Sequence, residues 1–202
     1  PAQLRRGLHI ILKESRRLTN MVEELLEFSK MQDGRFTLRI EDVDLQTEFE
    51  DAVYTYQELF RQDGIRLEYD DDGELYADPI PGDPERLKQV LCNVLDNAAK
   101  HGGSGKRIDT SISREGEFEV VRVRDYGPGI PEAYRESVFQ PFFRVDKSRS
   151  REKGGVGLGL SLVWEIAHLH GGSVRITESG KDGTVIELTL PISAEEQGIP
   201  CG

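Results

Sequence analysis

Three short segments carry residues whose types and spacing could bind a metal or a phosphate. The first is residues 84–101, where apolar residues recur at helical spacing and leave a polar face opposite them. That polar face carries Asn93, Asp96, Asn97 and Lys100. The two carboxamides lie about one helical turn apart, and Mg²⁺ prefers oxygen ligands that it usually shares with phosphate. Polar residues on the outer face of a helix are also commonly just solvated, so this segment alone leaves a metal site and an ordinary surface both open.

The second segment, residues 125–130, follows a strand-like run and combines an acid with glycines. The Asp125 carboxylate could accept a hydrogen bond from a ligand amine, while Gly127 and Gly129 leave bare backbone that a flat ring can approach. Gly-Pro-Gly is also common in surface turns, so a turn and a binding loop are equally compatible with this segment.

The third segment, residues 154–160, alternates glycine with apolar residues and leads directly into a predicted helix. The amides around Gly155, Gly157 and Gly159 could wrap phosphate oxygens, and the helix N-terminus adds favourable partial charge. The segment is not a P-loop, because no Gly-Lys-Ser/Thr closes it. It also departs from the dinucleotide fingerprint, because Leu160 stands where the last glycine belongs.

A long helix is predicted for the first thirty residues, ended by Asp33-Gly34. Its seam alternates spacings of four and three, as in a coiled coil or a helical bundle. The seam consists of Leu4, Leu8, Ile11, Ser15, Leu18, Val22, Leu25 and Ser29. An amphipathic helix cannot bury such a face alone. We therefore expect a partner, either a second copy of the chain or a helix outside it.

The remaining sequence alternates strand and helix patterns. Strands are predicted at residues 36–40, 65–69, 108–114, 117–124, 173–178 and 184–190, and helices at residues 45–62, 84–101 and 157–170. The mixture predicts an α+β fold, a two-layer α/β sandwich with a sheet on one side and helices on the other. We expect three parts: a helix at residues 1–34, a globular domain at 35–191 and a flexible tail at 192–202.

Composition and charge exclude several classes of protein. The 202-residue chain has a net charge of -11, which argues against a nucleic-acid binder that relies on Lys and Arg contacts to phosphate. No apolar run approaches the roughly 20 residues that cross a bilayer, and the N-terminus shows no signal peptide. The missing initiator Met suggests an excised fragment, whose parent could carry a membrane segment upstream. Cys92, predicted in the core, and Cys201, in the tail, favour a reducing cytoplasm.

In this order and at these separations, the three segments resemble the N box, G1 box and G2 box of the GHKL ATPase/kinase superfamily. Residues 139–144, Phe-Gln-Pro-Phe-Phe-Arg, are similar to the F box of sensor histidine kinases, and residues 143–150 resemble the ATP lid of the PhoR/WalK-like group. Residues 22–31 resemble the end of the second helix of the dimerisation domain. The resemblance covers about residues 4–191 and implies the Bergerat ATP-binding fold.

The resemblance also implies a role for each matching residue. Asn97 would ligate Mg²⁺ with Asn93 assisting, and Arg144 would steady phosphate charge, so these three are the expected catalytic residues. Asp125 would accept a hydrogen bond from the adenine amine. Contact with ATP is implied for Asn97, Lys100, His101, Asp125, Gly127, Gly129, Ile130, Phe143, Arg144, Lys147, Gly155, Gly157, Leu158, Gly159, Leu160 and Thr184. The implied cofactors are ATP and Mg²⁺.

Asn93 also discriminates within the superfamily. GHKL enzymes that hydrolyse ATP carry a glutamate at this position to activate water, and an amide cannot serve as that base. The residue therefore favours phosphoryl transfer to a protein acceptor, which requires mainly positioning and charge stabilisation.

The usual phosphoacceptor is not found in this sequence. The H box of the family places an acid and then Thr/Asn-Pro after the histidine, whereas His9 is followed by Ile-Ile-Leu-Lys-Glu. His101 ends one predicted helix, and His168 and His170 close another, where an imidazolium would suit the helix dipole. We therefore expect a chain that binds ATP with Mg²⁺ but cannot phosphorylate itself on the usual histidine.

The resemblance implies several partners. They are a histidine-containing dimerisation helix supplied separately, a response regulator, and a second subunit joined through the N-terminal helix. The chain would be a cytoplasmic domain of a parent held in the plasma membrane. Two other interpretations stay open: a GHKL serine kinase of the anti-sigma type, and a nucleotide-binding or dimerisation module without catalytic competence. The long heptad helix counts against the serine kinase.

Overall fold

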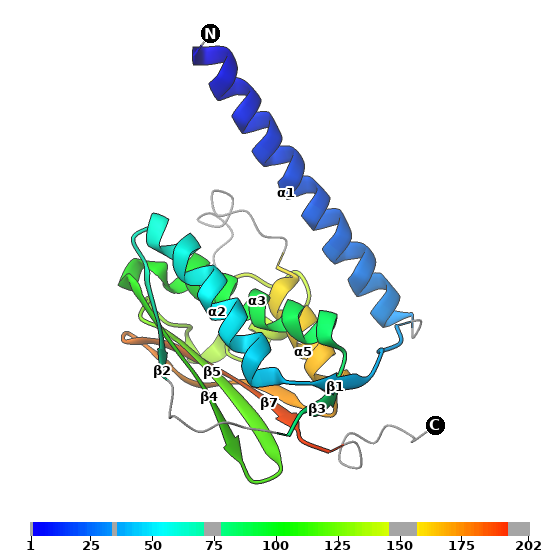
Figure 1. Cartoon of the computed structure of the whole chain (residues 1–202). Helices are drawn as coiled ribbons and strands as arrows, with labels where there is room; N and C mark the ends of the chain where they lie inside the picture. Colours follow the sequence, from blue (N-terminus) through cyan, green and yellow to red (C-terminus); the bar gives the residue numbers. More distant parts are fainter. Residues whose placement is uncertain (1, 34–35, 71–77, 146–156, 194–202) are drawn as a thin grey trace.

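A computed structural model describes residues 2–33, 36–70, 78–145 and 157–193. A sheet forms one layer and helices form the other, and a long N-terminal helix projects beyond them (Figure 1). The helices are α1 (Ala2–Gln32), α2 (Leu45–Gln62), α3 (Pro84–Gly102) and α5 (Gly159–Leu169). The strands are β1 (Glu41–Val43), β2 (Arg66–Asp70), β3 (Ile80–Gly82), β4 (Arg107–Glu115), β5 (Phe118–Asp125), β6 (Ser173–Gly180) and β7 (Gly183–Pro191). Short 3-10 helices cover Gly103–Gly105, Glu132–Tyr134 and Ser137–Phe139. The predicted two-layer α+β architecture is confirmed.

The main sheet has five strands in the order β2-β4-β5-β7-β6. The β2–β4 pair is parallel and the other pairs are antiparallel. The register of β5 and β7 places Asp125 opposite Thr184, and the register of β6 and β7 places Ser179 opposite Thr184. Three polar residues from three strands therefore meet at one end of the sheet.

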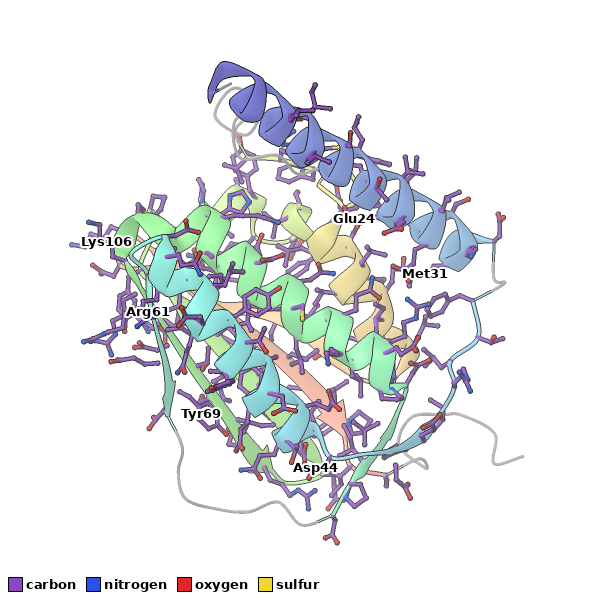
Figure 2. The ribbon with its side chains drawn as sticks, turned by 45° about the horizontal axis from the view of Figure 1, so that its top comes forward. Glu24, Met31, Asp44, Arg61, Tyr69 and Lys106 are labelled. Atoms are coloured by element: carbon purple, nitrogen blue, oxygen red, sulfur yellow. The ribbon has the colours of Figure 1, made fainter. Side chains whose placement is uncertain are left out.

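Aspartates cap two of the helices that cover this sheet, α2 and α3. The side chain of Asp44 accepts a hydrogen bond of 2.9 Å from the amide of Thr47 at the start of α2. Asp83 accepts one of 3.2 Å from the amide of Arg86, with a proline in the first turn of α3. Figure 2 shows Asp44 and Arg61 at opposite ends of α2. Each cap satisfies an N–H group that the helix itself leaves unpaired, which sets where the helix begins.

The apolar face of α3 packs against the sheet and fixes the direction of its polar face. The buried apolar residues of this helix are Leu87, Val90, Leu91, Val94, Leu95 and Ala98, each at most 3% exposed. Burying a side chain of the size of leucine or valine contributes about 1.5–3 kcal/mol. Rotating α3 would expose this face, so Asn93 and Asn97 are held on the side away from the core.

The strand predicted at residues 36–40 is wrong. The strand in this region is β1, which begins at Glu41 and pairs antiparallel with β3. The amide of Arg39 donates to a carboxylate oxygen of Asp83 at 2.9 Å, so a side chain takes the donor that a sheet would have used. Strand β3 was not predicted, because three residues are too few to show alternation.

Cys92 is half-buried instead of lying in the core. Its thiol shares a hydrogen bond with Tyr56 of α2, and burial raises the pKa of both groups. The neighbours Leu91 and Val94 are buried, but a helix turns successive side chains by about 100°, so Cys92 faces α2 and the edge of the layer. Cys201 lies outside the described residues.

Helix α1 exposes much of its predicted seam. The seam residues Leu8, Ile11, Leu18, Val22 and Leu25 are 47–62% exposed. The C-terminal part of α1 contacts the globular layer: the Phe28 ring packs edge-on against Phe142 at 6.3 Å, and Glu27 accepts hydrogen bonds from Arg86 and Gln89. In the part of the chain that the structure describes, no helix has the length and apolar character to span a membrane. The partner expected for the seam stays a prediction.

His170 is buried at the end of α5, so the imidazolium expected to suit the helix dipole there is not formed. Its side chain is 1% exposed, its Nδ1 lies 2.7 Å from the carbonyl oxygen of Ile166, and its Nε2 accepts a hydrogen bond of 3.0 Å from the amide of Asp83. A nitrogen that accepts an N–H carries no proton, so the ring is neutral. Burial lowers the pKa of His170, and the backbone and the Asp83 carboxylate only oppose this effect. Desolvation thus outweighs the helix dipole here.

We expect the fold to lose stability on acidification through His170. The pKa of this histidine is lowered in the folded chain from its ordinary value of 6.5, so the unfolded chain takes up the proton first. The stabilisation is complete above about pH 6.5 and falls below it by at most about 1.4 kcal/mol per pH unit. Urea unfolding at about pH 7.5 and about pH 5.5 should show a smaller loss for His170→Gln than for the wild type. His168→Gln removes a histidine of the same helical end that stacks on Trp164, and it should behave like the wild type. Equal losses in all three proteins would contradict the assignment.

Candidate functional site

The polar face of α3 lies beside the N-terminus of α5. A Cβ placed on Gly159 would lie 4.0 Å from the carboxamide oxygen of Asn93, so the two helices meet at this point. Asn93 and Asn97 are both half-buried. Leu158 caps α5 and is fully buried, and the Ser161 hydroxyl donates to its carbonyl at 2.8 Å. The buried Leu158 therefore anchors the start of α5, whose first-turn amides have no partner within the helix, beside Asn93.

Asp125 is a buried carboxyl group at the end of β5. It is 7% exposed, and its Oδ1 accepts a hydrogen bond of 2.8 Å from the amide of Gly127. Burial raises the pKa of Asp125, while hydrogen bonds from the backbone of Gly127 and Thr184 oppose this effect. Arg124 also favours the charged form, but burial outweighs these groups, and a ligand donor would offset more of the cost.

Glycines pack closely around the Asp125 carboxyl group. A Cβ on Gly102, at the end of α3, would overlap the Asp125 side chain. A Cβ on Gly127 would lie 3.0 Å from both Asp125 Oδ1 and the His101 carbonyl oxygen, and one on Gly183 would overlap the Asp125 carbonyl. Bare backbone on several sides of an acid suits the close approach of a flat ring.

The loop after Asp125 is held by the tip of the β6–β7 hairpin. Gly129 adopts a φ of +75°, and a Cβ there would overlap the backbone of Gly180. The amide of Ile130 donates to the Ser179 hydroxyl at 2.7 Å, and Arg135 donates to the Ser179 carbonyl. The Ser179 and Thr184 hydroxyl groups are 3.0 Å apart. The predicted residues Gly129, Ile130 and Thr184 are thus brought together with Asp125.

Residues 142–143 fold back onto the third glycine-rich segment, at Gly157. The amide of Phe142, which has a φ of +62°, donates to the carbonyl of Gly157 at 2.9 Å. Gly157 has a φ of +84°, and a Cβ there would lie 2.9 Å from the Phe143 carbonyl oxygen. The Phe143 ring contacts Tyr134 at 5.6 Å. Backbone contacts therefore leave no space for a side chain at Gly157.

Arg144 follows this contact and carries an unpaired buried donor. Its Nη2 is buried and has no hydrogen-bond partner among the described residues. A buried guanidinium donor without an acceptor is unfavourable, and an anion such as phosphate would satisfy it. The other predicted lid cation, Lys147, lies outside the described residues, as does Gly155.

Lys100 and His101 lie at the C-terminal end of α3, next to the glycine-lined acid. The ammonium group of Lys100 is 3.7 Å from a carboxylate oxygen of Asp96. Glu24 of α1 interacts electrostatically with Lys100 and Asp96. Burial raises the pKa of Glu24, and Lys100 opposes the rise. Figure 2 shows Glu24 on the side of α1 that faces the globular layer. Helix α1 therefore lies over this edge of the candidate site.

Four further residues of the site are not predicted from the sequence. Gly102 and Gly183 shape the space around Asp125, and Ser179 binds the loop that follows it. Tyr126 braces the same loop: its hydroxyl donates to Asp109 at 2.6 Å, and its ring lies 5.3 Å from the guanidinium carbons of Arg107 and Arg124. Gly102 could have been suspected as a glycine at a helix end, whereas no local pattern distinguishes Ser179.

The arrangement provides an acceptor at one end and donors at the other. Asp125 can accept from an amine, and the first turn of α5 with Arg144 can donate to phosphate oxygens. No group of three or more His, Cys, Asp or Glu side chains suited to a metal ion occurs within the described ranges. A divalent cation would thus depend on the carboxamide oxygens of Asn93 and Asn97 together with phosphate oxygens, which suits Mg²⁺.

Comparison with known proteins gives the family and close relatives. Residues 82–194 match the family model described as histidine kinase-, DNA gyrase B-, and HSP90-like ATPase. The chain is 36% identical over 198 residues to the signal transduction histidine-protein kinase AfsQ2 of Streptomyces coelicolor, which covers 96% of this chain and 35% of that protein. It is 33% identical over 194 residues to the signal transduction histidine-protein kinase ArlS of Staphylococcus epidermidis, covering 95% and 41%. The chain spans well under half the length of these curated relatives.

A solved structure of similar fold includes a partner protein. The crystal structure of histidine kinase ThkA in complex with the response regulator protein TrrA matches with a TM-score of 0.73 at 28% identity, and covers 96% of this chain and 53% of that chain. The fold and the resemblance to sensor histidine kinases are confirmed by these matches.

Proposed function

Because the chain belongs to the histidine kinase-, DNA gyrase B- and HSP90-like ATPase family, we propose that it binds ATP with Mg²⁺ and transfers the γ-phosphoryl group to a histidine of another helix. The observation that carries this proposal is the buried Asp125 carboxyl group in its setting of glycines. A buried acceptor flanked by bare backbone favours a base with an exocyclic amine, because a carbonyl at that position would meet the carboxylate.

The phosphate end of the proposed site would be formed by two elements. The amide of Gly157 and the first-turn amides of α5, including that of Gly159, would bind phosphate oxygens. The unpaired Nη2 of Arg144 supports a nearby anion, because phosphate would satisfy this buried donor. We assign Leu158 and Leu160 to anchoring this helix and Phe143 to packing beside it.

Asn97, with Asn93 assisting, would hold Mg²⁺ together with the phosphates. When bound, the cation would neutralise charge that develops on the phosphoryl oxygens. The amide at position 93 cannot take a proton from water, so the site favours an acceptor that brings its own nucleophile. In the proposed reaction, an imidazole nitrogen forms a bond to the γ-phosphorus as the bond to the β-phosphate oxygen breaks, and ADP leaves.

The acceptor and the other partners would lie outside this chain. The exposed seam of α1 suits a helical hairpin that carries the histidine and joins two subunits. ThkA forms a complex with a response regulator protein, and we propose a response regulator as the partner that takes the phosphoryl group from this system. We further propose that the longer protein anchors this part to a membrane through a segment outside these residues.

One mixture separates the proposed function from its alternatives. The chain is incubated with ATP, Mg²⁺ and a separate hairpin that carries an H box, and the phosphate on the hairpin is tested for acid lability. A histidine kinase gives acid-labile phosphate on the hairpin. A serine kinase or a module that only binds nucleotide gives none, and that result would contradict the proposal.

A further inference from the structure

A short chain of hydrogen bonds links the loop after Asp125 to the Thr184 hydroxyl. The amide of Ile130 donates to Ser179 Oγ at 2.7 Å, and Ser179 Oγ lies 3.0 Å from Thr184 Oγ1. Both hydroxyl groups stand on the same face of adjacent strands, because Ser179 and Thr184 are directly paired in register. The direction of the proton between these two oxygens decides what Thr184 can offer to a ligand.

We propose that Ser179 is a positioning residue that keeps the Thr184 hydroxyl pointing as a donor toward the base beside Asp125. The inference rests on the proposed function, since it assigns part of the same nucleotide site. It gives Ser179 a role in selecting adenine although Ser179 itself need not touch the nucleotide.

The orientation of the two hydroxyl protons depends on the hydrogen bonds that each oxygen already makes. Ser179 Oγ already accepts the Ile130 amide, and a hydroxyl that accepts one hydrogen bond becomes a better donor for the next. Of the two possible directions of the Ser179–Thr184 hydrogen bond, we infer the one in which Ser179 donates its proton to Thr184 Oγ1. Thr184 is 4% exposed, so its own proton also requires an acceptor. We infer that the bound base supplies that acceptor, either directly or through one water molecule.

The Thr184 hydroxyl lies close enough to Asp125 for one base to contact both residues. Thr184 faces Asp125 across the β5–β7 pair, and its backbone amide hydrogen-bonds the Asp125 carboxyl group. In adenine, the exocyclic amine is flanked by two ring nitrogens, N1 and N7, that accept hydrogen bonds. In guanine, a carbonyl replaces the amine and N1 carries a proton. An acceptor at Asp125 next to a donor at Thr184 therefore matches adenine and opposes the Watson–Crick edge of guanine.

The same two strands carry a second hydroxyl pair that serves as a matched control. Ser173 Oγ and Thr189 Oγ1 lie 2.7 Å apart at the far end of β6 and β7, and the pair is exposed. Replacing Ser173 by alanine removes the same kind of cross-strand contact without changing the candidate site. Any effect that Ser179→Ala shows and Ser173→Ala does not is then a property of the site.

The test compares the affinities of the full chain for ATP, 1-deaza-ATP and 7-deaza-ATP by calorimetry. The wild type and Ser173→Ala should bind one of the two analogues about tenfold more weakly than ATP, because that analogue lacks the acceptor for Thr184. Ser179→Ala should bind ATP more weakly and bind ATP and that analogue equally. Ser179→Thr, which keeps a hydroxyl on a β-branched residue suited to a strand, should restore the discrimination.

The possible failures are distinguishable. If the wild type binds ATP and both analogues equally, or if Ser179→Ala keeps the discrimination of the wild type, the proposed role of Ser179 is wrong while the proposed function stands. If the wild type binds no ATP, both are wrong. Thermal unfolding of each variant shows whether it is folded, and a Ser179→Thr protein that is folded yet fails to discriminate also overturns the proposal.

Discussion

Replacing Asp125 with asparagine is expected to weaken ATP binding by about 10- to 100-fold, the cost of losing one hydrogen bond to a charged, buried acceptor. The carboxyl group is 7% exposed and is held by the amide of Gly127, so it cannot swing away to be replaced by water. Asparagine keeps the size of the side chain but replaces one acceptor oxygen with an NH₂ donor. Calorimetric titration with ATP measures the loss directly.

Glu119→Gln is the matched control for this substitution. Glu119 is a second buried acid on the same strand, and it pairs with Arg114 at 3.0 Å at the other end of β5. Both variants remove a buried carboxylate from β5, but only Asp125→Asn changes the proposed adenine contact. Equal ATP affinities for the two variants would mean that Asp125 does not contact the base.

Gly183→Ala is expected to lower the free energy of unfolding by about 2–4 kcal/mol, because it combines a strained backbone with a steric overlap. Gly183 has a φ of +108°, which residues with a Cβ rarely adopt, and the added methyl would overlap the Asp125 carbonyl. The β5–β7 pairing would have to open to make room. Urea unfolding followed by circular dichroism measures the change.

Gly180→Ala is a close control from the same hairpin. A Cβ at Gly180 meets nothing within 4 Å, and its backbone conformation is accessible to other residues. This variant should stay within about 1 kcal/mol of the wild type. If Gly183→Ala unfolds at the same urea concentration as Gly180→Ala, then Gly183 does not form the tight contact described here.

The parts of the fold that could be predicted are those with strong local signals. Helix α2 spans the predicted residues 45–62, and α3 begins at the predicted Asp83-Pro84 cap. The hairpin strands β4 and β5 showed clear alternation and a Glu-Gly turn. Periodicity, caps and turns act within a few residues, so one sequence is enough to reveal them.

The features that could not be predicted depend on contacts between segments distant in the sequence. Residues 36–40 alternate like a strand, but the Arg39 amide pairs with Asp83, which is 44 positions away. His170 was interpreted from its helix alone, whereas Asp83 and the core bury it. Ser179 acquires its place only when β6 folds against β7 and the loop after Asp125. No window along the chain contains that information.

In the candidate site, too, residues with a local pattern could be predicted and residues defined by distant contacts could not. The three glycine- and asparagine-bearing segments could be recognised from residue types and spacing, and the structure brings Asn93 to Gly159 and Asp125 to Thr184. Gly102 and Gly183 could not be recognised in this way, because their importance comes from the Asp125 side chain and carbonyl that they adjoin. Their lack of a side chain is a property of the assembled site.

The most direct test of the central claim is transfer of labelled phosphate to a histidine on a separate hairpin. The chain is mixed with γ-labelled ATP, Mg²⁺ and an H-box hairpin, and label on the hairpin is measured before and after acid treatment. The proposed function predicts label that acid removes, its reduction by about 10- to 100-fold with Asp125→Asn at an ATP concentration well below the wild-type Kd, and its retention with Glu119→Gln. Tight ATP binding without any acid-labile label on the hairpin would contradict the assignment of this chain as a histidine kinase.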